Sequence, residues 1–166
     1  MRSLAMGAVS LLSVMVAAQP SMAADKWYPA KVYDASSGKD VEAEYTPLEK
    51  AAKPYNICVL FPHMKDSYWV AVAYGLVSEA QDLGVGMNLY EAGGYENLPR
   101  QLSQFDDCLA AGVDAIIIGS ISEAGVAQKF EEAAKKGIPV IAVGNPVSAG
   151  KLPAMIYADF KTMGGM

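Results

Sequence analysis

The sequence has little cysteine, little histidine and no excess of basic residues. Two cysteines in 166 residues are too few for a disulfide-framework miniprotein or for a four-cysteine zinc site. The single histidine, His63, excludes most multi-histidine metal sites and gives little support for nucleophilic catalysis. Because 13 basic residues face 18 acidic ones, the chain lacks the positive charge that binding to nucleic acid needs. We therefore expect no enzyme activity, no cofactor and no metal.

Apolar residues, in contrast, are abundant. They make up 52% of the chain, and charged residues make up only 19%. A chain of this composition can bury a core, so a folded domain is expected rather than disorder. Length alone fits one ordinary domain.

The N-terminus resembles an export signal. Residues 1–23 contain one arginine, a short apolar run over 4–18, and small residues at Ser21 and Ala23. The run is shorter than the roughly 20 apolar residues of a membrane span. We predict a signal peptide that is cleaved after Ala23 and directs the protein to the periplasm; a retained membrane anchor is the alternative. The polar, proline-containing residues 24–54 lack periodicity and are interpreted as an extended N-terminal arm.

From Tyr55 to Phe160, short apolar runs alternate with segments of helical period. The expected strands are 56–61, 85–90, 114–119, 139–144 and 154–158, and the expected helices are 67–83, 98–111 and 123–136. This alternation predicts an α/β lobe: a parallel sheet covered by helices on both faces, in three layers. Ser67 is the expected N-cap of the first helix. We expect the first strand to lie between the second and the third.

In such sheets, ligands bind in the loops beyond the carboxyl ends of the strands. This rule selects residues 61–69, 91–97 and 119–123. None of them contains a glycine-rich dinucleotide motif or a phosphate-binding loop.

Three aromatic residues in these loops suggest a cage. Tyr68 and Trp69 begin the first helix, and Tyr95 follows two glycines in the second loop. Aromatic rings attract methylated ammonium groups by cation–π interaction, and Asp66 would add a negative charge. Each residue also has a structural alternative: core packing for Trp69, an exposed loop position for Tyr95, and a helix cap for Asp66.

The two cysteines allow two interpretations. Cys58 lies on the first expected strand and Cys108 on the second expected helix, which crosses over that strand in the expected order. In an oxidising compartment they either form a disulfide or remain two buried thiols.

Several segments resemble a known family. YNICVLFPHMKDSYWVAVAYGLVSEAQDLGV, QLSQFDDCLAAGVDAIIIGSIS and KKGIPVIAVGNP are similar to the N-terminal lobe of type I periplasmic binding proteins, the ribose-binding/LacI-like superfamily. Members have two such lobes joined by a hinge, with the ligand between them. The resemblance implies that the second lobe is missing, that 161–166 begins the hinge, and that the chain is truncated.

The resemblance also implies a ligand. Sugar-binding members typically carry two phenylalanines where this chain has Tyr68 and Trp69. FPHMKDSYW and EAGGYENL are instead similar to members that sense trimethylamine N-oxide and signal to a membrane sensor histidine kinase. By this resemblance, Tyr68, Trp69, Tyr95 and Asp66 would contact the ligand. The alternative is the solute-binding component of an ABC transporter for a sugar or another small solute.

Overall fold

The structure is a computed structural model that describes residues 28–34, 39–148, 152–158 and 164–165. The chain divides into two compact units between Pro47 and Leu48, upstream of the predicted start of the lobe at Tyr55. The predicted signal peptide lies outside the described residues, as does most of the predicted start of the hinge.

The first unit contains a two-stranded antiparallel sheet. Its strands are β1 (Ala30–Asp34) and β2 (Val41–Tyr45), with Ala30 opposite Tyr45. Nearly all of their residues are exposed, and Lys31 pairs with Glu42 at 2.9 Å. These strands were not predicted from the sequence: the residues of β2, VEAEY, alternate between apolar and acidic over five residues, but the segment was interpreted as part of an extended arm.

The second unit is built on a five-stranded parallel sheet in the order β4-β3-β5-β6-β7. The strands are β3 (Asn56–Phe61), β4 (Gly86–Glu91), β5 (Ala115–Ile118), β6 (Val140–Val143) and β7 (Ala154–Ile156). The first strand of the lobe, β3, lies between the second and the third. The predicted strand order and the predicted parallel α/β fold are therefore confirmed.

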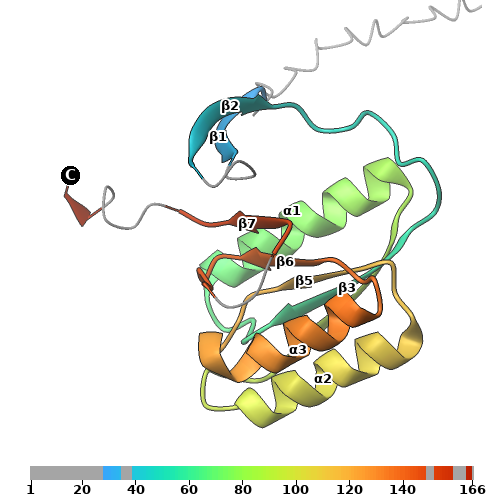
Figure 1. Cartoon of the computed structure of the whole chain (residues 1–166), viewed down its shortest axis with the longest axis vertical. Helices are drawn as coiled ribbons and strands as arrows, with labels where there is room; N and C mark the ends of the chain where they lie inside the picture. The colour runs from blue at the N-terminus through green and yellow to red at the C-terminus, as the bar shows by residue number, and fades with distance from the viewer. Residues whose placement is uncertain (1–27, 35–38, 149–151, 159–163, 166) are drawn as a thin grey trace, which may run out of the picture. The chain divides into compact units, whose positions relative to one another are not determined.

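Three helices cover this sheet. They are α1 (Ser67–Leu83), α2 (Leu98–Ala111) and α3 (Glu123–Lys135). Figure 1 shows α2 and α3 on one face of the sheet and α1 on the other, which gives the three layers predicted. Glycines in the left-handed conformation end α1 and α2, with φ of 67° at Gly84 and 64° at Gly112. Among the described residues, no helix is long and apolar enough to cross a membrane.

The core has one cluster on each face of the sheet. Alternate residues of β3 point to opposite faces, so Val59 and Phe61 pack toward α1 whereas Cys58 and Leu60 pack toward α2 and α3. Because both faces of β3 are buried, its sequence NICVLF is apolar almost throughout.

A disulfide links this central strand to the helix layer. It joins Cys58 of β3 to Cys108 of α2, with a Cα–Cα distance of 6.0 Å. Both residues are almost fully buried. The helix that crosses over β3 is thus attached covalently to the strand beneath it.

Candidate functional site

The candidate site lies at the carboxyl edge of the sheet, where the loops after four neighbouring strands meet. Tyr68 and Trp69 follow β3, Tyr95 follows β4, Ser120 follows β5, and Asn145 follows β6. Hydrogen bonds join residues from all four loops. This is the edge at which parallel α/β sheets bind their ligands.

The start of α1 is set by Asp66. Its carboxylate accepts a hydrogen bond from the Trp69 N–H at 3.0 Å, so Asp66 is the N-cap. The prediction that Ser67 caps this helix is wrong, because Ser67 is already the first helical residue. The other carboxylate oxygen of Asp66 lies 3.7 Å from Nε2 of the buried His63.

Trp69 forms the floor of the site rather than its surface. Only 2% of the residue is exposed, and its ring centroid lies 4.8 Å from that of Phe61. Two glycines make room for the indole. A Cβ at Gly119 would lie 2.2 Å from the ring, and a Cβ at Gly144 would lie 2.9 Å from it.

Of the three aromatic residues predicted to form the cage, Tyr68 and Tyr95 reach solvent. They are 41% and 47% exposed. Tyr68 packs edge-on against Trp69 with centroids 5.2 Å apart, and its hydroxyl lies beside Gly144. Partial burial raises the pKa of the Tyr68 hydroxyl, and the neighbouring Tyr95 and Asp66 raise it further. Tyr68 is therefore a neutral phenol at physiological pH.

Hydrogen bonds connect the Tyr95 hydroxyl to two other loops. Its oxygen accepts from Nε1 of Trp69 and from Nδ2 of Asn145, each at 3.3 Å. Nδ2 of Asn145 also donates to the carbonyl oxygen of Ser120 at 2.8 Å. Asn145 was not predicted from the sequence, because the loop after the fourth strand was not among those selected. The carboxyl-edge rule, applied to that strand as well, would have included it.

Buried amides hold the neighbouring loops. Gln101 of α2 donates to the Gly119 carbonyl at 2.9 Å and accepts from the Ile121 N–H at 3.0 Å. Gln104 donates to the carbonyl of Glu91 at 2.9 Å. The backbone after β4 and β5 is thus anchored to α2, which keeps the floor of the site in place.

The arrangement is suited to binding. Two exposed phenol rings stand over a buried indole, with hydroxyl groups available at the rim. Across the described residues, no three His, Cys, Asp or Glu side chains gather in a way that would hold a metal ion. Which of Tyr68, Trp69, Tyr95 and Asp66 touch a ligand stays a prediction.

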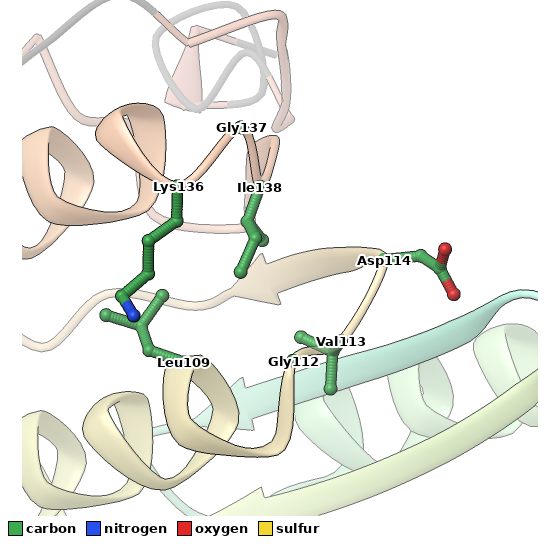
Figure 2. A pocket seen from close by; sticks show the side chains of 7 residues that line it. All are labelled: Leu109, Gly112, Val113, Asp114, Lys136, Gly137 and Ile138. Atoms are coloured by element: carbon green, nitrogen blue, oxygen red, sulfur yellow. The ribbon is translucent and has the colours of Figure 1, made fainter.

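A separate hollow of about 380 Å³ lies at the opposite edge of the sheet. It is lined by the loops that precede β5 and β6, and Figure 2 shows Lys136 extending beside Leu109 while Asp114 points away from both. The Asp114 carboxylate is engaged elsewhere: it accepts from Lys53 at 2.7 Å and from the Asn56 N–H at 2.8 Å. This edge therefore carries structural contacts, and the candidate site remains the carboxyl edge.

Comparisons with known proteins agree on one family. Residues 57–166 match the model of a periplasmic binding protein domain. The chain is 31% identical to the periplasmic protein TorT of Escherichia coli K12 over 150 residues, which are 87% of this chain and 40% of that protein. It thus spans well under half the length of this curated relative.

Two solved structures are similar in fold. An ABC transporter solute-binding protein from Bradyrhizobium sp. BTAi1, with bound Bis-Tris, has a TM-score of 0.77 and 48% identity, covering 86% of this chain and 44% of that one. The complex of TorT with the TorS sensor domain in the presence of trimethylamine N-oxide (TMAO) has a TM-score of 0.60 and 36% identity, covering 66% of this chain and 38% of that one.

Proposed function

The chain belongs to the periplasmic binding protein family, and on that premise we propose that it supplies one wall of a ligand-binding cleft for TMAO or a similar methylated amine. The observation that carries the proposal is the pair of exposed tyrosines over the buried Trp69. They stand at the edge of the sheet where α/β proteins bind ligands. We expect no catalytic activity from this lobe.

The chemistry of TMAO matches these groups. Its three methyl groups surround a positively charged nitrogen, which aromatic faces such as those of Tyr68 and Tyr95 attract. Its anionic oxygen needs a hydrogen-bond donor, because a buried acceptor without one costs about 1–3 kcal/mol. The rim hydroxyls are such donors. Asp66, the N-cap of α1, would also bring a carboxylate to the positive nitrogen.

The relatives support a proposal for the partner and the location. TorT is a periplasmic protein and forms a complex with the sensor domain of TorS. We propose that this protein likewise acts in the periplasm, after cleavage of residues 1–23, and reports ligand binding to a membrane sensor histidine kinase. The ligand would shift the balance between two forms only by its differential affinity for them.

A second function has its own support. The Bradyrhizobium relative is described as an ABC transporter solute-binding protein and is more identical to this chain than TorT is. Its bound Bis-Tris is a tertiary amine that carries hydroxyl groups. A solute-binding role in uptake of a sugar or another small solute is therefore the alternative.

Calorimetric titration of the full-length protein tests the ligand. We expect heat of binding from TMAO and none from ribose or galactose. Tyr68→Ala should weaken binding of TMAO at least about tenfold, since it removes one aromatic wall. Tyr74→Ala is the matched control, because Tyr74 lies on the same helix, is 75% exposed and is outside the site. Heat from a sugar and none from TMAO would refute the proposal.

The neighbouring genes and a binding assay separate the two roles. A sensor kinase gene beside this one, and capture of that kinase's purified periplasmic domain by the protein, support signalling. Permease and ATPase genes, with no capture of a sensor domain, support uptake.

A further inference from the structure

The hydroxyl oxygen of Tyr95 has two hydrogen-bond donors and no other partner among the residues described. Trp69 Nε1 and Asn145 Nδ2 both lie 3.3 Å from it. The tyrosine itself is 47% exposed, and the hydrogen bond between its hydroxyl and Asn145 lies in the exposed part of the site.

Neither donor can change its role. An indole N–H only donates. The amide of Asn145 has two possible orientations, but its nitrogen lies 2.8 Å from the Ser120 carbonyl oxygen. The flipped amide would place oxygen against oxygen, so this carbonyl determines which end of the amide is the donor.

These contacts leave the Tyr95 hydroxyl with one available role. A phenol oxygen offers two acceptor positions, and both are used by N–H groups. Its own hydrogen has no acceptor in the described part of the chain. We propose that Asn145 is a positioning residue which, together with Trp69, holds the Tyr95 hydroxyl as an obligate donor, so that the ligand must bring a hydrogen-bond acceptor to it.

This inference rests on the proposed ligand site and narrows its chemistry. An amine oxide carries an acceptor oxygen beside its methyl groups and satisfies the requirement. Tetramethylammonium has similar size and charge at nitrogen but no acceptor, and would leave the hydroxyl hydrogen unpaired. The two N–H donors also polarise the phenol, which strengthens the bond that it donates.

Calorimetry with both compounds tests the donor. We expect the full-length wild-type protein to bind TMAO at least about tenfold more tightly than tetramethylammonium. Tyr95→Phe keeps the ring but removes the hydroxyl, and it should weaken TMAO binding by about 10- to 100-fold. Affinity for tetramethylammonium should change by no more than about twofold, because its contacts are with the ring.

A second variant tests the role of Asn145. In Asn145→Asp, the carboxylate accepts the Tyr95 hydroxyl hydrogen, so the donor is consumed inside the protein. The preference for TMAO over tetramethylammonium should then disappear or reverse. Asn88→Asp is the matched control: it makes the same charge change at an exposed position on β4 and should leave the preference unchanged. Circular dichroism checks that each variant is folded. If Asn145→Asp does not fold, the Tyr95→Phe titrations decide whether the Tyr95 hydroxyl acts as an obligate donor.

The outcomes separate this inference from the proposed function. TMAO binding that is unaffected by Tyr95→Phe, or equal wild-type affinity for the two compounds, overturns the inference and leaves the TMAO site standing. If the protein binds ribose or galactose instead, the TMAO proposal fails. Weaker binding of that sugar by Tyr95→Phe then supports the donor role of the Tyr95 hydroxyl, and unchanged binding overturns the donor role. Binding of none of these compounds overturns both.

Discussion

The fit of Trp69 against Gly119 leads to a specific prediction for Gly119→Ala. The added Cβ would lie 2.2 Å from Cη2 and 2.6 Å from Cζ3 of the indole. Favourable carbon–carbon contacts are about 3.5–4.0 Å, so the ring would have to move by more than an ångström. The backbone at Gly119 is held by hydrogen bonds to Leu60 and Gln101 and cannot easily move instead.

The expected cost follows from how far the ring is displaced. Overpacking a core typically costs about 1–3 kcal/mol. Complete removal of a large aromatic side chain costs about 3–5 kcal/mol. Because the indole is rigid and packs on Phe61, we expect Gly119→Ala to lower the free energy of unfolding by about 3 kcal/mol. Gly119 does not have a positive φ, so the cost is steric and does not come from the backbone conformation.

Urea denaturation followed by tryptophan fluorescence measures this cost. The chain has two tryptophans, so a Trp27→Phe background makes Trp69 the sole reporter. Gly75→Ala is the control, since a Cβ at Gly75 of α1 would meet nothing within 4 Å. The control should raise stability by about 0.5–1 kcal/mol, the usual gain for alanine over glycine in a helix. A change below about 0.5 kcal/mol in Gly119→Ala would refute the steric reasoning.

Three further predictions concern stability. Asp66→Ala should cost about 1 kcal/mol in urea denaturation through loss of the N-cap, whereas Asp66→Asn should be nearly neutral; equal losses would argue against capping. Replacing Cys58 and Cys108 together by alanine should cost up to about 4 kcal/mol, because the disulfide joins residues 50 apart, and a loss under about 1 kcal/mol would contradict this. The hydrogen bond from Lys53 and that from a backbone N–H lower the pKa of Asp114 from 3.8, so its stabilisation is present above pH 3.8 and is lost as the pH falls through the lowered pKa. Thermal unfolding against pH should therefore show a shallower acid decline in Asp114→Asn, and an unchanged decline would exclude this contribution.

Most of the lobe could be predicted from local patterns. The apolar run of β3 and the helical period of α1 are properties of neighbouring residues, so their predicted bounds agree with the structure. The strands β1 and β2 were missed, because the five-residue alternation in β2 was not separated from the aperiodic arm around it. The N-cap was predicted at Ser67, with capping by Asp66 as an alternative role; the structure confirms Asp66, since both are good caps and only backbone geometry separates them.

The site was predicted less completely than the fold. The sequence identified Tyr68, Trp69 and Tyr95 as neighbours at one edge of the sheet, and the structure brings them together. It left core packing of Trp69 as one of two alternatives, and the structure confirms that one: the indole is buried in the space left by Gly119 and Gly144, which follow β5 and β6.

The alternation of strands and helices, the strand order of the lobe and the resemblance to a binding-protein family could all be predicted without a structure. These three features depend on the hydrophobic periodicity of each segment and on the order of the segments along the chain. Which donors meet at the Tyr95 hydroxyl is visible only in the folded chain, since Trp69 and Asn145 lie 26 and 50 residues from Tyr95 along the sequence. Such contacts arise where the loops of different strands converge, and the pairing of the strands, together with the space left between their side chains, sets them.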